Sequence, residues 1–235
     1  MTWLSIGFFL AARELPQFDT THGGVTRLLK VAEVERRTRG ELRMVLDNAG
    51  LDPRGHPDFM RALSPRGSGV PLVELAGLQR SILRSVPRDM PADGWISSRF
   101  GERQLPGHIG PELHKGIDIA ASEGTLVRAP SDGIVRFSGR YGGFGLYLSI
   151  VHGFGFVTKY AHNSKLLVKA GDYVTRGDPI AIIGSTGRAS GIHLHYEVWV
   201  NDKPIDPTAF MPSLRLPDTN VLVMAPQLFH WNIDP

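Results

Sequence analysis

Two histidines, His193 and His195, lie one residue apart in GIHLHYEVWV, which alternates polar and apolar residues as a half-buried strand does. Residues i and i+2 of a strand point to the same face, about 6.5–7 Å apart. The two imidazoles therefore share a face with Glu197 and Trp199. The other face is predicted to meet the core, and it carries Ile192, Leu194, Tyr196, Val198 and Val200.

A second group of candidate ligands, His114 and Asp118, lies in the stretch HKGID. The four-residue spacing could place both side chains on one helix face, whereas Gly116 and the neighbouring isoleucines favour a loop that enters a strand. Either geometry can bring both side chains to one ion. Two imidazoles and one carboxylate, with a fourth position open for water, are the ligand set of a catalytic zinc site. The ligand count predicts His114, Asp118 and one histidine of the HxH pair as ligands.

The other histidine of the pair is then free for proton transfer. A zinc hydrolase needs a general base and a group that steadies the oxyanion or protonates the leaving amine. The HExxH motif that supplies a glutamate base in many zinc peptidases is absent. An imidazole with a pKa near 6.5 can do the same work. His162, in the stretch TKYAH at the end of another expected strand, supplies a further imidazole.

Two more residues are candidates for supporting roles. Tyr160 lies two residues before His162, so it would share that face and could donate to an oxyanion, unless it packs in a barrel core. Glu197 could orient a ligand histidine, unless it is an exposed strand carboxylate. His152, in the turn HGFG, is predicted to be structural.

The chain from Trp95 onward has an all-β pattern. Short β-branched and aromatic runs are punctuated by glycines, with turns such as SDG, HGFG and RGD. This pattern predicts a mainly β fold of antiparallel hairpins that close into a small barrel or sandwich.

The N-terminal part is predicted to be helical. Apolar residues recur at three- and four-residue steps over 25–49, before Gly50, and over 71–86, which starts with a proline. We expect a helical hairpin that packs near the β domain. The Pro-rich stretch 87–94 separates the two. The expected organisation is a helical region over 1–90, a catalytic domain over 91–215 and an irregular tail over 216–235.

The composition excludes several function classes. The 235 residues include 26 basic and 23 acidic residues without a polybasic block, so no nucleic acid is expected as a partner. The chain has no cysteine, so a metal must bind His, Asp or Glu. No segment reaches the roughly 20 apolar residues of a membrane span. The stretch over 1–12 is interpreted as an export signal, a truncated anchor or an apolar helix end. Nothing predicts the oligomeric state.

Taken in order, the stretches HKGIDIAASEGTLVRAPSDGIV, TKYAH and GDYVTRGDPIAIIGSTGRASGIHLHYEVW resemble the lysostaphin/LytM family of zinc metallopeptidases. The lead-in ISSRFGER is also family-like, and the similarity covers about 95–211. The resemblance implies one Zn²⁺ per chain, bound by His114, Asp118 and His195, with His162 and His193 as the catalytic histidines.

The resemblance also implies a small antiparallel β domain, a barrel-sandwich hybrid, with the site in a groove. It further implies an endopeptidase that cuts the stem or cross-bridge peptides of bacterial peptidoglycan, in the periplasm or outside the cell. Three alternative functions agree less well with the sequence. A non-catalytic LytM-type protein that binds the cell wall or activates another hydrolase conflicts with the intact motifs. A biotinyl or lipoyl carrier lacks the lysine on its hairpin. A non-haem iron oxygenase shares only the ligand types.

Overall fold

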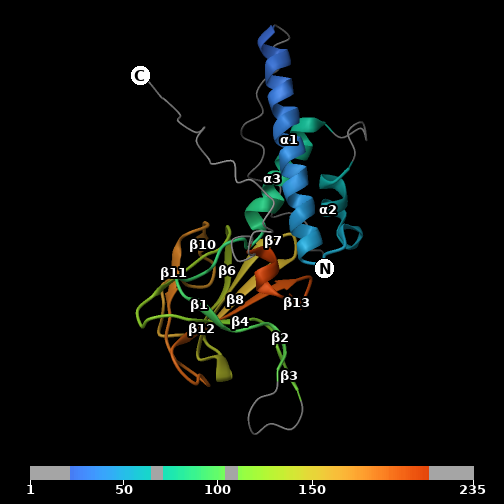
Figure 1. Cartoon of the computed structure of the whole chain (residues 1–235). Coiled ribbons are helices and arrows are strands. Elements are labelled where there is room, and N and C mark those ends of the chain that lie inside the picture. The colour runs from blue at the N-terminus through green and yellow to red at the C-terminus, as the bar shows by residue number, and fades with distance from the viewer. Residues whose placement is uncertain (1–21, 65–70, 104–110, 212–235) are drawn as a thin grey trace, which may run out of the picture.

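The computed structural model describes residues 22–64, 71–103 and 111–211, and the side chains of the first helix from Ala32 onward. The stretch over 1–12, interpreted as an export signal, a truncated anchor or an apolar helix end, lies outside the described residues, as does the predicted tail over 216–235. Figure 1 shows a group of helices next to a β-rich part, from which the hairpin of β2 (Gly101–Arg103) and β3 (Glu112–His114) projects. The chain is thus divided into a helical region before Trp95 and a β region after it.

The helical region contains α1 (His22–Asn48), η1 (Pro53–Gly55), α2 (Pro57–Ala62) and α3 (Leu72–Ser85). Helix α1 ends near the predicted position, where Gly50 adopts a left-handed conformation with φ 63° and Leu51 N–H donates to Leu46 O. The sequence pattern does not predict α2, because six residues are too few to show helical periodicity.

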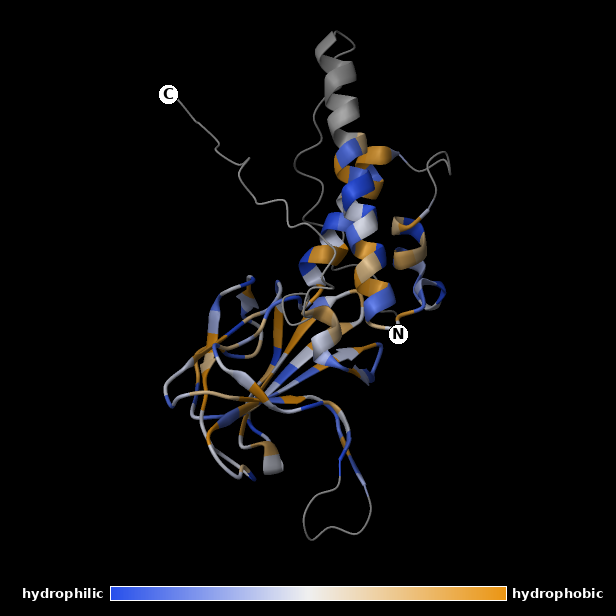
Figure 2. Ribbon diagram, viewed as in Figure 1, coloured by the Kyte–Doolittle hydropathy of each residue, from blue (hydrophilic) through white to orange (hydrophobic). Residues whose placement is uncertain are grey.

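One hydrophobic core joins the helices to the strands. Leu42 and Leu46 of α1 and Ile82 of α3 are fully buried in the same cluster as the apolar residues of the sheets. Arg176 donates to Val86 O at 3.1 Å and Leu83 O at 3.4 Å, near the C-terminal end of α3. Figure 2 shows hydrophobic residues on α1 where it approaches the β region and along the strands. The helical region therefore packs directly on the strands.

The β region is built from three antiparallel sheets. The 8-stranded sheet contains, in spatial order, β1 (Trp95–Ser98), β4 (Ile117–Ala120), β12 (His193–Val200), β8 (Phe156–Asn163), β7 (Leu146–Gly153), β6 (Gly133–Arg140) and β10 (Tyr173–Val174), with β13 (Lys203–Ile205) beside β12. The other sheets contain β5 (Leu126–Arg128), β11 (Pro179–Ile182) and β9 (Lys165–Leu166), and β2 (Gly101–Arg103) with β3 (Glu112–His114). Two short helices, η2 (Gly142–Phe144) and η3 (Pro207–Phe210), complete the described elements.

This architecture confirms the predicted mainly β fold class with antiparallel sheets behind a helical region. Among the described residues, the largest sheet has free ends at β1 and β10, so it does not close into a barrel. None of the described helices combines the length and the hydropathy that a membrane crossing requires.

The alternation of β12 sets which residues face the core. Leu194, Tyr196 and Val198 are fully buried, as the period of two predicts. Ile192 is an exception, because it precedes the strand and is 41% exposed. The expectation that Ile192 faces the core was therefore wrong.

Helix α2 meets the strands at the end of β12 that is opposite the histidines. Strand β12 pairs Val200 with Phe156 at one end and His195 with Ala161 at the other. The ring of Phe59 in α2 lies 6.2 Å from that of Phe156. Five residues of strand, roughly 16 Å, separate this contact from the histidine end. The contact of α2 with the strands therefore lies at the end of β12 opposite the histidines, whereas the ring of Phe144 in η2 lies 6.0 Å from that of His195.

Candidate metal centre and its surrounding histidines

Three side chains converge where β3, β4 and β12 meet. His195 pairs in register with Asp118 across β12 and β4. Asp118 Oδ1 lies 2.9 Å from His195 Nδ1 and 3.2 Å from His114 Nε2, and these two nitrogens are 3.1 Å apart. The ligand atoms of these residues could hold one metal ion. Of the two histidines that the sequence offered as the third ligand, the structure brings His195 to this position.

The glycine of HKGID lets the loop approach β12. A Cβ atom on Gly116 would lie 2.2 Å from Tyr196 O, closer than any real contact. His114 ends β3 and Asp118 lies within β4, so the two side chains meet across a tight loop. Of the two geometries that the spacing allowed, the structure has the loop that enters a strand.

Each of the three candidate ligands also contacts a residue outside the cluster. His114 Nδ1 donates to Arg99 O at 2.7 Å, and His195 Nε2 donates to Glu197 Oε1 at 3.0 Å. Because a carbonyl and a carboxylate only accept, these bonds assign the outer nitrogen of each ring as the N–H. Arg103 Nη1 lies 3.3 Å from Asp118 Oδ2, which leaves Oδ1 for the cluster.

This arrangement fits a bound cation. With the outer nitrogens protonated, the inner nitrogens of His114 and His195 present lone pairs toward Asp118 Oδ1. Three lone-pair atoms about 3 Å apart repel one another unless a proton or a metal ion lies among them. Two imidazoles and one carboxylate are a donor set that divalent transition metals accept.

The charges of the site follow from this convergence. Burial by itself would raise the pKa of Asp118, but the hydrogen bonds with His114 and His195 outweigh burial and hold that pKa well below its ordinary value. Burial would lower the pKa of His195, but the two carboxylates beside it raise the pKa to about 9. Without a metal, a proton therefore occupies the cluster at neutral pH, and metal binding must displace it.

His162 and His193 lie next to the cluster. Their ring centroids are 4.9 Å apart, and His193 Nε2 lies 3.9 Å from Asp118 Oδ1. His162 Nδ1 donates to Thr186 O at 2.8 Å and His193 Nδ1 donates to Gly191 O at 3.0 Å. In the neutral form of each ring, Nε2 is then the acceptor. Burial lowers the pKa of His162 below its ordinary value, which favours this neutral form.

His162 reaches the site through an unusual backbone conformation. Its φ is +64°, in the left-handed region that non-glycine residues rarely adopt. The turn is held by Thr186, whose hydroxyl donates to Asn163 O at 2.7 Å and accepts from Leu146 N at 2.9 Å. This conformation interrupts the alternation of β8.

The expectation that Tyr160 shares a face with His162 is corrected by the structure. Tyr160 is fully buried on the core face, where its ring packs beside Tyr196 and its hydroxyl bonds to Thr158 Oγ1 at 2.7 Å. The positive φ of His162 turns that residue to the opposite face. Tyr160 therefore belongs to the core and is not placed to donate to an oxyanion.

Glu197 is 4% exposed and binds three donors. Besides His195, it accepts from Trp199 Nε1 at 2.6 Å and lies 3.3 Å from Lys159 Nζ. These contacts place it directly behind His195, as expected for a residue that orients this ring.

Sequence reasoning missed Arg99, Arg103 and Thr186. The two arginines belong to ISSRFGER, a stretch noted only as a family-like lead-in. Arg99 acts through its backbone carbonyl, which carries no signal of residue type. Thr186 is far from His162 in sequence, and the positive φ that it supports cannot be read from a strand pattern.

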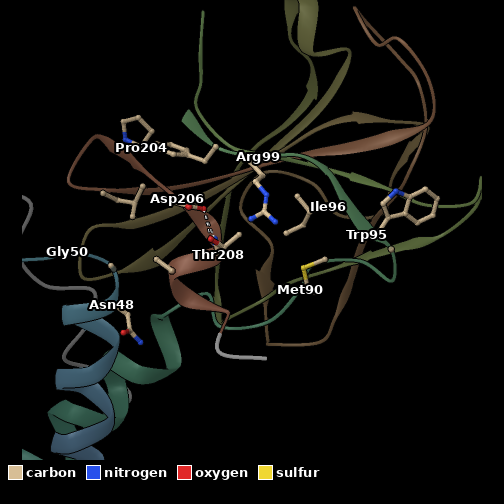
Figure 3. Close-up of a pocket in the computed structure, with 14 residues that line it drawn as sticks. Asn48, Gly50, Met90, Trp95, Ile96, Arg99, Pro204, Asp206 and Thr208 are labelled. Carbon is tan, nitrogen blue, oxygen red and sulfur yellow. Dashed lines mark hydrogen bonds between the residues drawn. The ribbon is translucent and has the colours of Figure 1, made fainter. Parts of the chain in front are cut away.

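A separate cleft of about 910 Å³ lies where α1 ends beside β1, β13 and η3. Figure 3 shows Asn48 and Gly50 on one side and Arg99, Asp206 and Thr208 around the opening. None of the predicted site residues lines this cleft. The carbonyl of Arg99, which accepts from His114, connects the two places.

The fold and the site together define a mainly β domain with a candidate metal centre. Residues 112–207 match the model of peptidase family M23. The chain carries a domain of this family, which confirms the resemblance to the lysostaphin/LytM peptidases.

Two curated relatives and one solved structure illustrate the match. The DD-carboxypeptidase/endopeptidase Mpg of Neisseria meningitidis serogroup B is 43% identical over 133 residues, which are 56% of this chain and 31% of Mpg. The peptidoglycan DD-endopeptidase ShyA of Vibrio cholerae is 41% identical over 114 residues, 47% of this chain and 26% of ShyA. The catalytic domain of lysostaphin from Staphylococcus simulans is 33% identical, covering 50% of this chain and 92% of that one, with a TM-score of 0.46. The matches to Mpg and ShyA span about a third or less of those relatives.

Proposed function

We propose that this chain is a zinc-dependent metalloendopeptidase that hydrolyses peptide bonds in the cross-links of bacterial peptidoglycan. Four imidazoles whose outer nitrogens are all occupied gather around Asp118, and this observation carries the proposal. The family and the activities for which Mpg and ShyA are named support a peptidase acting on the cell wall.

His114, Asp118 and His195 are the proposed zinc ligands. Nitrogen and oxygen donors without any thiolate suit zinc in a catalytic site, and three protein ligands leave a position for solvent. A zinc ion held by these residues would supply an activated water and an electrophile for the scissile carbonyl.

His162 and His193 are the proposed catalytic histidines. In the neutral form of each ring, Nε2 is the acceptor, because Nδ1 donates to Thr186 O in His162 and to Gly191 O in His193. The Nε2 atom of one ring can accept a proton from the attacking water, and the same ring can then donate that proton to the leaving amine. The domain over 91–215 would carry this activity in the cell envelope.

Elemental analysis and release of soluble fragments from purified peptidoglycan test the proposal. We expect near-stoichiometric zinc and fragment release for the wild type. His193→Ala should keep the metal and lose release, whereas Asp118→Ala should lose both. Zinc without release by the wild type from any wall type would instead favour a binding or activator protein, and absence of zinc would remove the ligand assignment.

A further inference from the structure

A row of four side chains crosses the sheet beside the metal centre. Strand pairing aligns Glu197 with Lys159, Lys159 with Ser149, and Ser149 with Phe137, over β12, β8, β7 and β6. Residues paired in register lie on the same face of a sheet. Glu197 is two residues from His195, so this row lies on the face that bears the site.

Positive charge gathers at the Lys159 position. Lys159 Nζ lies 3.5 Å from the centre of the Trp199 ring, and Lys115 Nζ lies 5.8 Å from the centre of that ring. Arg136 is close enough to act electrostatically on both Lys159 and Tyr147. Two ammonium groups therefore lie near one aromatic ring, and Arg136 adds a third positive charge close enough to act on Lys159.

The carboxylate of Glu197 does not balance this charge. It is already shared among His195, Trp199 and Lys159. Within the described residues, neither Lys115 nor Arg136 forms an ion pair, and both are exposed. Burial lowers the pKa of Lys159. Glu197 raises this pKa, whereas the positive charges of Lys115 and Arg136 lower it. The patch thus has an excess of positive charge.

We propose that Lys159, Lys115 and Arg136, with Trp199 as a flat apolar support, form a subsite for a free carboxylate of the substrate peptide. This inference rests on the proposed peptidase function and names a chemical feature of its substrate. A charge-assisted bond from the ammonium or guanidinium groups favours a carboxylate over its amide.

The distance sets which residue of the substrate would carry the carboxylate. His195 and Glu197 are two residues apart along β12, a distance of about 6.5–7 Å. Lys159 of β8 pairs in register with Glu197. An extended peptide spans about 3.3–3.6 Å per residue. The carboxylate therefore belongs to a substrate residue about two positions from the scissile bond.

The inference is tested by cleavage of two cross-linked peptides. They differ only at this acidic residue, which carries a carboxylate in one peptide and a carboxamide in the other. We expect the wild type to prefer the carboxylate about tenfold in kcat/KM. Lys159→Met and Arg136→Gln should both reduce this ratio, and Arg136→Gln should do so with metal content unchanged. Arg136→Gln leaves the Glu197–His195 contact in place, and Lys169→Met, an exposed lysine outside the row, is the matched control.

Equal cleavage of the two peptides by the wild type would overturn the proposed subsite. An equal loss of kcat/KM for both peptides in the variants would overturn it as well. If the wild type cleaves neither peptide, the proposed function fails, and equilibrium binding of the same two peptides decides the subsite separately. Tighter binding of the carboxylate form, reduced by Arg136→Gln, would support the subsite. Equal binding would reject it.

Discussion

His195 is held at Nε2 by Glu197 Oε1, 3.0 Å away, so that its Nδ1 meets Asp118 Oδ1 at 2.9 Å. A strand spacing of two residues is enough for this contact, because both side chains leave the same face of β12. The carboxylate thereby decides which nitrogen of the ring can bind a metal ion.

Glu197→Gln should weaken metal binding by about 10–100-fold, the usual effect of losing a carboxylate behind a ligand histidine. The amide keeps the shape but loses the charge that fixes the ring. Competition with a chromophoric chelator would measure the affinity, and thermal unfolding would check that the variant folds. Glu123→Gln, at an exposed turn, should bind metal as the wild type does. Equal affinity in both variants would contradict the role of Glu197.

Gly116→Ala should destabilise the fold by about 1–3 kcal/mol and lower metal content. The added Cβ would lie 2.2 Å from Tyr196 O, so the loop between His114 and Asp118 must move away from β12. Urea unfolding and elemental analysis would measure both effects. Gly77→Ala in α3 is the control, because its Cβ would meet no atom within 4 Å and alanine favours the helix. A Gly116→Ala protein as stable as the wild type would show that the loop is not confined as described.

Thr186→Val should reduce activity while leaving metal content unchanged. Valine cannot donate to Asn163 O or accept from Leu146 N, and each unpaired group costs about 1–3 kcal/mol. The strained backbone of His162 would then relax and withdraw its ring from the site. Fragment release, metal content and urea unfolding should be compared with Thr175→Val, an exposed turn threonine. Unchanged activity in Thr186→Val would mean that His162 does not depend on this support.

The buried His152 should make stability depend on pH. Its Nδ1 donates to Asp132 O at 2.9 Å, and its Nε2 accepts from Thr158 Oγ1 at 2.6 Å. Burial lowers its pKa from the ordinary 6.5 to about 4. The unfolded chain therefore binds a proton first, so stability is full above pH 6.5 and falls by about 3 kcal/mol between pH 6.5 and 4.

Urea unfolding from pH 4 to 8 would measure this loss in the wild type and in His152→Gln. The glutamine can keep both hydrogen bonds but does not titrate, so the difference between the two proteins isolates His152 from the histidines of the site. Parallel pH profiles for the two proteins would count against the predicted effect.

The sequence by itself determined the mainly β class, the end of α1 near Gly50 and the buried face of β12. These features depend on local periodicity and on glycine conformations, which a single chain displays directly. Pairing HKGID with HxH also follows from residue types, since ligand chemistry admits few combinations. The same reasoning leaves the choice between His193 and His195 open, because both share one face.

Only the tertiary structure decided that choice, through the register that places His195 opposite Asp118. It also decided that His162, and not Tyr160, faces the site, because a positive φ reverses the alternation that a strand pattern assumes. The support from Arg99, Arg103 and Thr186 is equally invisible in the sequence, since it depends on a backbone carbonyl and on long-range hydrogen bonds. Residue types indicate which chemistry is available, but contacts between distant strands determine which atoms meet.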